Sequence, residues 1–181
     1  MNFSDLDYQP IILTLQLAAV TVVVLLIIGI PISWWLAHTR ARCRPVIEAV
    51  VALPLVLPPT VLGFYLLILL GPNGWIGKPV AAIIGSPLSF SFTGLVIAST
   101  LYSLPFVVQP LHNAFEAVGK DLLEAAWTLG ASKWNAFWTV ASPLALRGYI
   151  TAVVLGFAHT LGEFGVVLMV GGSIPGKTKV L

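Results

Sequence analysis

The C-terminal stretch Gly171–Thr178 has residue types and a spacing that could bind a nucleotide. It reads GGSIPGKT and satisfies the pattern G-x-x-x-x-G-K-[ST], whose backbone amides and lysine cradle phosphates in nucleotide-binding proteins. Such a loop requires a preceding strand and a following helix whose N-terminus holds phosphate. Here a long apolar segment precedes the pattern, and only Lys179, Val180 and Leu181 follow it. We therefore interpret the stretch as a loop rich in Gly and Pro, and not as a nucleotide site.

A second candidate for chemistry is the pair His159 and Glu163, four residues apart in an apolar stretch. At this spacing the two side chains share one face of a helix and could contact each other. Ionisable side chains inside a membrane are energetically costly and usually face the bundle interior or water. Glu163 is therefore a candidate pathway or gate residue, and the pair could form the proton relay of a secondary transporter or channel. We favour a simpler interpretation, a polar contact that locks helix packing.

The sequence offers no other constellation with catalytic potential. Its single cysteine, Cys43, excludes an intrachain disulfide and a multi-cysteine metal site. It contains no paired carboxylates, metal-ligand cluster or activated nucleophile, so we expect neither an enzyme nor a bound cofactor or metal. The formal net charge of +2 is too small to indicate nucleic-acid binding.

The elements that carry these residues are apolar segments of membrane-spanning length. Of 181 residues, 58% are hydrophobic and 9% are charged, and the mean hydropathy is +0.98. This composition is typical of an integral membrane protein. A span needs about 20 apolar residues, and the sequence predicts four helical spans, at about residues 13–36, 46–70, 92–111 and 149–170. The first lacks the basic start of a cleaved signal peptide, so we expect it to be retained.

The distribution of basic residues predicts how the spans are oriented. Six of the nine Lys and Arg residues lie in or beside the connections after the first and third spans: Arg40, Arg42, Arg44, Lys120, Lys133 and Arg147. The other three lie in the remaining connections: Lys78, Lys177 and Lys179. Because cytoplasmic connections are enriched in Lys and Arg, we expect the group of six to be cytoplasmic and the N-terminus to be external.

The second predicted span contains three prolines within LPLVLPPTVLG, residues 53–63. Proline removes a backbone donor and restricts the residue before it, so the helix should break here. We expect Pro59 to begin a second half-helix with Thr60 in its first turn, where free amides would attract anions. Irregular backbone at membrane depth is tolerated where it lines a cavity. Pro58, Pro59 and Thr60 are therefore candidate pathway residues, although a packing kink would explain the prolines equally well.

A short amphipathic helix is predicted between the third and fourth spans, at about residues 122–130. Asp121 could cap it, with Glu124 reaching back to the cap, and Gly130 suits the left-handed residue that ends a helix. Ser132 could cap a second helix that runs toward the membrane. The expected stripe of the first helix consists of Leu122, Ala126 and Leu129.

The residues from Glu124 to Pro143, EAAWTLGASKWNAFWTVASP, resemble the EAA loop of permease subunits in binding-protein-dependent ABC importers. In that family the loop forms a coupling helix that docks into a groove on a cytoplasmic ATPase. The resemblance implies an ATPase-coupling role for Glu124, Ala125, Ala126, Gly130 and Pro143. The two alanines would leave a flat surface for close approach. Ser142 departs from the pattern, since the family usually has Leu there. Without the resemblance, the segment is a capped helix that connects two spans.

Three further stretches resemble molybdate permeases: Leu53–Gly63, Leu161–Gly165 and Ser173–Thr178. His159 departs from the pattern of these proteins, which tend to carry a basic residue at that position. The resemblance implies an all-α integral membrane protein with the transmembrane domain of a type I (MetI-like) ABC importer. Four spans are expected in this chain, and a fifth is expected to be missing at its C-terminus.

The same resemblance implies a permease that works as a homodimer in the inner membrane. Two cytoplasmic ATPase subunits would hold the ATP, and a periplasmic or lipid-anchored protein would deliver an oxyanion. The implied cargo is molybdate, together with tungstate. Sulfate or thiosulfate is the alternative within the class, since permeases for these anions share the coupling signature.

Overall fold

The computed structural model describes residues 8–175 and 177–180. Within these residues the chain is built from helices and loops, and it contains no strand. The prediction of an all-α protein is therefore confirmed. The predicted external placement of the N-terminus concerns residues 1–7, which lie outside the described residues.

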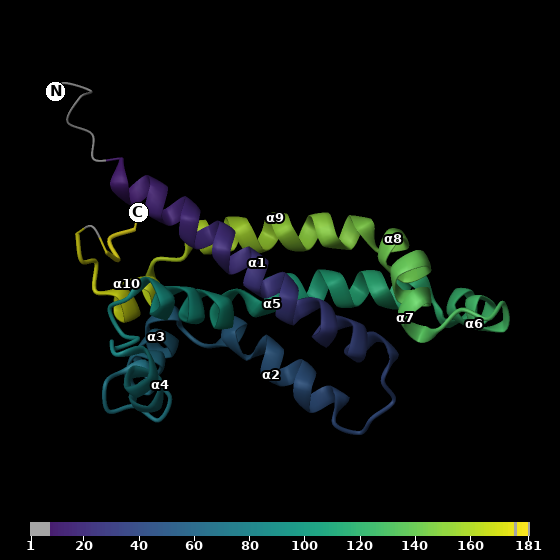
Figure 1. Ribbon diagram of the computed structural model, residues 1–181, viewed down its shortest axis with the longest axis horizontal. Helices are drawn as coiled ribbons and strands as arrows, with labels where there is room; N and C mark the ends of the chain where they lie inside the picture. Colours follow the sequence, from purple (N-terminus) through teal and green to yellow (C-terminus); the bar gives the residue numbers. More distant parts are fainter. Residues whose placement is uncertain (1–7, 176, 181) are drawn as a thin grey trace.

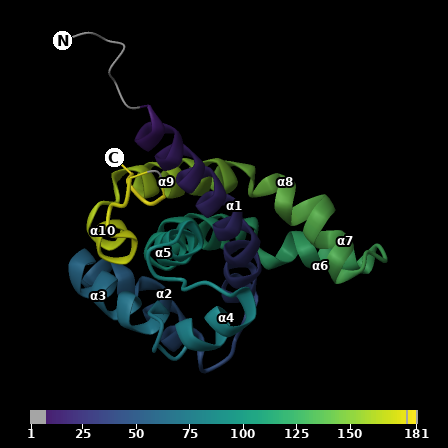
Figure 2. The ribbon, with the colours of Figure 1, turned by 60° about the vertical axis from the view of Figure 1, so that its left-hand side comes forward.

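Three long helices form the body of the molecule: α1 (Gln9–His38), α5 (Phe92–Val118) and α9 (Leu146–Gly162). Helices α5 and α9 run along the long axis in Figure 1 and α1 crosses them obliquely, and α5 occupies the centre of the bundle in Figure 2. Pro10 lies in the first turn of α1, where a missing amide has no helical partner to lose. The Ser91 hydroxyl caps α5 by accepting a hydrogen bond from the Gly94 amide at 3.1 Å.

The second predicted span is broken into two helices, α2 (Arg44–Val56) and α3 (Pro59–Leu70), which are bent by 111°. Pro58 precedes α3 as its cap residue, and Pro59 is the first helical residue. Proline is well suited to that position because its missing amide would have no partner there. The predicted break and the predicted start of the second half-helix are both confirmed. A further short helix, α4 (Gly77–Ile84), lies in the following connection.

The fourth predicted span does not continue to residue 170. Helix α9 ends at Gly162, and Glu163 has an extended backbone, with φ −80° and ψ 104°. A separate helix, α10 (Gly165–Gly171), follows the break. Within the described part of the chain, two helices, α1 and α5, are long and apolar enough to cross a membrane by themselves, and the number rises to four if two bent pairs each count as one span. These pairs are α2 with α3, and residues 133–144 with α9, which are bent by 71°.

Four short elements connect α5 to α9 at one end of the bundle. They are α6 (Lys120–Thr128), α7 (Lys133–Ala136), a π-helical turn η2 (Phe137–Ala141) and α8 (Ser142–Leu144). The predicted short helix at 122–130 thus exists as α6, and it begins and ends two residues earlier than expected. It lies at the far tip of the molecule in Figure 1.

The two ends of the molecule differ in their number of basic residues. The α1–α2 loop and the first residues of α2, α6, α7 and α9 lie at one end in Figure 1, and they carry the six basic residues expected to be cytoplasmic. Helix α4 and the chain after α10 lie at the opposite end and carry the other three. At the first end, Arg44 forms ion pairs with Glu48 at 2.6 Å and Glu116 at 3.3 Å, which connect α2 to the end of α5.

A cluster of aromatic rings holds the elements together near α6. Phe115 of α5 is fully buried. Its ring makes edge contacts with Trp34 of α1, at 5.3 Å between centroids, and with Tyr149 of α9, at 5.8 Å. Phe137 of η2 lies 5.9 Å from Phe115 and 4.9 Å from Trp34. One ring of α5 therefore contacts α1, α9 and the turn that carries α6 and α7.

We expect Phe115→Ala to destabilise the protein by about 3–5 kcal/mol, because the neighbouring rings cannot fill the space that it leaves. Thermal unfolding of the full-length protein in detergent will measure the change. Phe64→Ala is the control, since Phe64 is 51% exposed and lies in α3, outside this cluster. Equal destabilisation by both substitutions would contradict a central role for the ring cluster.

Candidate functional site

The two helix breaks, α2–α3 and α9–α10, lie against each other. A Cβ atom added to Gly165 at the start of α10 would lie 2.8 Å from the Pro59 Cβ and 3.6 Å from the Thr60 amide nitrogen. A Cβ added to Gly63 of α3 would lie 2.9 Å from the Met169 Cβ of α10. Only glycine permits such close approach at these two positions. The sequence alone did not identify Gly63 or Gly165 as site residues, although a glycine within the first two turns of each helix was a signal that was available.

The start of α3 has fewer unpaired amides that could bind an anion than the sequence suggested. The amides of Val61 and Leu62 both donate to the Pro58 carbonyl, at 3.0 and 3.1 Å. Pro59 has no amide hydrogen, so in this first turn the Thr60 amide is the one without an acceptor among the described residues. Pro58, Pro59 and Thr60 are exposed on the surface of the described chain. The three residues are therefore accessible, and the proline carbonyl accepts hydrogen bonds from two of the amides that follow them.

Glu163 lies inside the subunit and not on its surface. Its side chain is at the break between α9 and α10 and is 6% exposed. Neither carboxylate oxygen has a hydrogen-bond partner with acceptable geometry among the described residues. The Ser99 hydroxyl of α5 is close enough to interact with this carboxylate, but no hydrogen bond of acceptable geometry forms between them.

His159 does not pair with Glu163, so the predicted contact between them is wrong. The His159 Nδ1 atom lies 2.9 Å from the Ser103 hydroxyl of α5, and the imidazole stacks on the Phe106 ring at 3.8 Å. The Ser103 hydroxyl also lies 3.2 Å from the Thr160 hydroxyl. The helix ends between the two predicted partners, so the i, i+4 spacing no longer places them on one face. A polar contact that locks packing does exist, but it joins α9 to α5.

A layer of polar groups without partners crosses the bundle at the α9–α10 break. The Thr21 and Ser99 hydroxyls are fully buried and have no hydrogen-bond partner among the described residues. Leu17 and Leu95, each one helical turn before these residues, pack together with Val167 of α10. Gly156 of α9 faces Val22 of α1, and Val167 packs with Leu17, so Glu163, which lies between Gly156 and Val167 in sequence, is near the level of Thr21. Ser99 is close enough to Glu163 to interact with its carboxylate, so the three polar groups form one layer.

The face that α6 presents to the outside differs from the predicted stripe. Leu123 is fully buried and anchors the helix to the aromatic cluster, and Ala126 packs against the same cluster. Leu122 and Leu129 are exposed, the latter by 89%. The stripe Leu122, Ala126 and Leu129 is therefore wrong, because the buried leucine turns Ala126 inward. Glu124 and Ala125 are exposed together with the two outer leucines.

The predicted stop of α6 is confirmed, and its predicted cap is wrong. Gly130 has φ +88° and open space around it, as a left-handed residue after a helix requires. The Ser132 hydroxyl accepts a hydrogen bond from the Asn135 amide at 3.2 Å and caps α7 as predicted. Asp121, however, lies in the first turn of α6 and forms no cap. Gly119, with φ +74°, lies before the helix and allows α6 to begin immediately after α5.

Pro143 and Ser142 lie where the chain turns from η2 into α8. Pro143 occupies the first turn of α8. The Ser142 hydroxyl donates to the Tyr149 hydroxyl of α9 at 3.2 Å. The residue that departs from the EAA pattern therefore connects the segment to the long helix that follows it.

The stretch that resembles a phosphate-binding loop folds into a compact turn at the end of α10. The Thr178 hydroxyl is buried, donates to the Gly171 carbonyl and accepts a hydrogen bond from the Ile174 amide at 3.1 Å. The amides of residues 177–179 return to the Ile174 carbonyl. Gly176 of this stretch lies outside the described residues. The hydroxyl that would bind a metal in a nucleotide site is used within the turn, which supports the interpretation as a loop.

Comparisons with known proteins agree on one family. The sequence profile of the family "Binding-protein-dependent transport system inner membrane component" matches residues 29–179. The "Molybdenum transport system permease protein ModB" of Azotobacter vinelandii is 60% identical over all 181 residues, which cover 80% of that protein. The protein of the same name from Escherichia coli K12 is 37% identical over the same residues, which cover 79% of it. A "Probable sulfate transport system permease protein cysT" of Zygnema circumcarinatum is 33% identical over 96% of the chain and 62% of its own length.

We expect Gly165→Ala to push the two breaks apart, because its Cβ would lie 2.8 Å from that of Pro59. Overpacking of this kind destabilises a protein by about 1–3 kcal/mol. Thermal unfolding of the full-length protein will measure the change. Gly162→Ala is the matched control, since nothing lies within 4 Å of a Cβ added at that position. If both variants unfold at the temperature of the wild type, the two breaks are not in close contact.

Proposed function

The chain belongs to the family of binding-protein-dependent transport system inner membrane components, and we infer from this that it is the permease subunit of an ATP-driven importer. It is a membrane transport subunit, and we propose that ATP is hydrolysed by separate partners. Two copies of the permease would form the path, two cytoplasmic ATPase subunits would drive it, and a soluble or lipid-anchored binding protein would deliver the cargo. The observation that carries this proposal is the 60% identity over the whole chain to a molybdenum transport permease.

The proposed cargo is molybdate, together with tungstate. The relatives named for molybdenum transport include the one with 60% identity. The sulfate alternative has weaker support, since the relative named for sulfate is 33% identical. No Lys or Arg lies in the apolar core of any predicted span. A dianion held firmly at the bilayer centre would need such a partner, so we propose that selectivity resides mainly in the binding protein.

Helix α6 is the proposed contact with the ATPase. It lies at the tip of the bundle, and it exposes Leu122, Ala125 and Leu129. Leu123 ties the same helix to the aromatic cluster, so a push on α6 would reach α1, α5 and α9 together. Gly130 would allow the chain to turn at the edge of the contact, and Pro143 would stiffen the return to α9.

The proposed pathway passes the exposed residues Pro58, Pro59 and Thr60 at the α2–α3 break. In a homodimer this surface would face the partner copy, and the single free amide of Thr60 would give a weak stopping point. Weak binding suits transport, since a tightly held ion leaves slowly. Glu163 is buried behind these residues, next to Gly165. We therefore propose that it contributes to the pathway by shaping the α9–α10 break and not by contact with the anion.

The interpretation as a secondary transporter or channel has lost its main support. It depended on a proton relay between His159 and Glu163, and His159 pairs with Ser103 of α5. The family match covers residues 29–179 and includes the segment proposed to couple to an ATPase.

We expect Gly130→Leu to uncouple ATP hydrolysis from uptake in the reconstituted transporter. A left-handed backbone costs a non-glycine residue about 1–2 kcal/mol. If the loop shifts to relieve this strain, the association with the ATPase should weaken by about 5- to 30-fold. Molybdate uptake per ATP hydrolysed, measured in proteoliposomes, is the readout. Gly85→Leu is the control, since Gly85 has a similar φ of +79° and equally open space but lies after α4. Unchanged coupling in the Gly130 variant would refute the assignment of α6.

We expect the α1–α2 loop to be cytoplasmic and the α3–α4 connection to be external. After replacement of Cys43, a membrane-impermeant thiol reagent added to intact cells should label a Trp75→Cys variant and leave an Ala41→Cys variant unlabelled. Trp75 is 93% exposed, and Ala41 is also exposed, so burial would not hide either position. Labelling of position 41 alone would reverse the proposed topology.

A further inference from the structure

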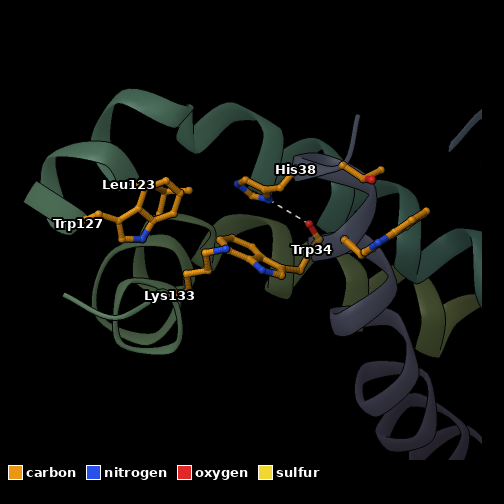
Figure 3. Close-up of a pocket in the computed structure, with 7 residues that line it drawn as sticks. Trp34, His38, Leu123, Trp127 and Lys133 are labelled. Carbon is orange, nitrogen blue, oxygen red and sulfur yellow. Dashed lines mark hydrogen bonds between the residues drawn. The ribbon is translucent and has the colours of Figure 1, made fainter. Parts of the chain in front are cut away.

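Two adjoining cavities open between the C-terminal half of α1 and the segment that includes α6 and α7. The first, of about 360 Å³, lies between His38 of α1, Trp127 of α6 and Lys133 of α7, as Figure 3 shows. The second, of about 400 Å³, lies between Ile30 and Pro31 of α1 and Phe137 of η2. Trp34 and Lys133 line both cavities, so the two form one groove along α1. Neither cavity includes a residue of the two helix breaks.

One end of the groove is more polar than the other. Its first cavity includes His38 and Thr39, which lie at the end of α1 beside the basic α1–α2 loop. Its second cavity begins at Ile30, nine residues earlier, which corresponds to about 13 Å of helix. The lining side chains of the second cavity are apolar or aromatic apart from Lys133.

The side-chain charge that lines the groove is positive. Lys133 is the single ionic side chain among the residues that line the two cavities, and no carboxylate lines either of them. In Figure 3 its side chain extends toward the Trp34 indole. The Nδ1 atom of His38 donates to the Trp34 carbonyl at 3.0 Å, which fixes the imidazole at the polar end of the groove. Arg40 and Arg42 follow on the exposed loop.

We propose that this groove binds one anionic phospholipid, with the headgroup phosphate at Lys133 and an acyl chain along Ile30, Pro31 and Phe137. The charge and the order of polarity match those of a lipid in the leaflet at this end of the bundle. A water-soluble partner would contact the polar end but could not follow the groove two turns along a membrane helix. Tryptophan and lysine side chains are also those that proteins use at the boundary between headgroups and hydrocarbon.

A lipid in this groove would contact α1, α7 and the base of α6 at once. It would fill the space between the helix proposed to bind the ATPase and the first membrane helix, so it would restrict movement of α6 relative to α1. The inference rests on the proposed membrane insertion of α1. It depends neither on the identity of the cargo nor on the orientation of the chain.

Native mass spectrometry of the purified full-length transporter complex can test the proposal directly. The delipidated complex is titrated with dioleoyl phosphatidylglycerol or with the zwitterionic dioleoyl phosphatidylcholine. We expect tighter binding of phosphatidylglycerol to the wild type. We expect Lys133→Gln to weaken that binding by about fivefold, the contribution of one basic residue near a lipid surface. Lys133→Arg should retain it.

Two controls separate this groove from general surface binding. Lys120→Gln removes an exposed lysine at the same end that lines neither cavity, and it should leave lipid binding unchanged. Trp134→Ala should weaken the binding of both lipids, because Trp134 lines the second cavity. Trp138 lies one turn later and outside the cavity, so Trp138→Ala should leave the binding of both lipids unchanged.

Three results would overturn the proposal. Equal affinity of the wild type for the two lipids would show that the groove does not select for headgroup charge. Equal losses of phosphatidylglycerol affinity in the Lys133 and Lys120 variants would show that the lipid binds elsewhere. Retention of phosphatidylglycerol by the isolated permease but not by the complex would show that the ATPase fills the groove. Because the spectra also report the intact mass, loss of lipid from an assembled complex is distinct from failure of the proposed ATPase association.

Discussion

The structure depends on one constraint: backbone polar groups at membrane depth need partners, so a helix can break there only where other parts of the protein cover the break or where the break lines a water-filled cavity. This chain breaks two helices, after Val56 and after Gly162, and packs the two breaks together. Gly165 on Pro59 and Gly63 on Met169 bring the backbones of α3 and α10 into contact. Each break thereby covers part of the other, and the irregular backbone is concentrated in one place.

Helix α5 connects this region to the other end of the molecule. Near its start it packs against α10 and α3, and near its end Phe115 lies in the aromatic cluster that anchors α6. Between these points it forms the Ser103 contacts with His159 and Thr160 of α9. A rigid helix with packed contacts at both ends is a physical connection between the tip that would meet an ATPase and the breaks that would line the path. Helix α6 itself has a single buried leucine, and this anchor, the contact of Ala126 and the short connection through Gly119 join it to the bundle.

The sequence predicted the features that depend on local chemistry and missed those that depend on packing. Pro58 and Pro59 remove donors wherever they occur, so the α2–α3 break and the start of α3 could be predicted from the residues alone. Gly130 and Ser132 were likewise predicted correctly, because a left-handed stop and a hydroxyl cap are local. The break after Gly162 contains no proline and was read as a continuous span. Asp121 was expected to cap α6, but Gly119 allowed the helix to start earlier. The contact between the two breaks could not be predicted, since residues far apart in sequence form it.

The polar layer at Thr21, Ser99 and Glu163 gives the α9–α10 break a physical reason to rearrange, because these groups could gain hydrogen bonds. A buried polar group without a hydrogen bond costs about 1–3 kcal/mol, and more when it is charged. In this arrangement none of the three groups finds a partner among the described residues, although they share one level of the bundle. A small rotation of α5 or α10 could bring a hydroxyl onto the carboxylate, and an opening at the break would admit water to it. Either change would stabilise the layer, whereas the apolar layers on both sides are already well packed. A rearrangement at this break would therefore supply partners that the buried polar groups lack in the present arrangement, and Gly165 places the break in contact with Pro59 and Thr60 of the proposed path.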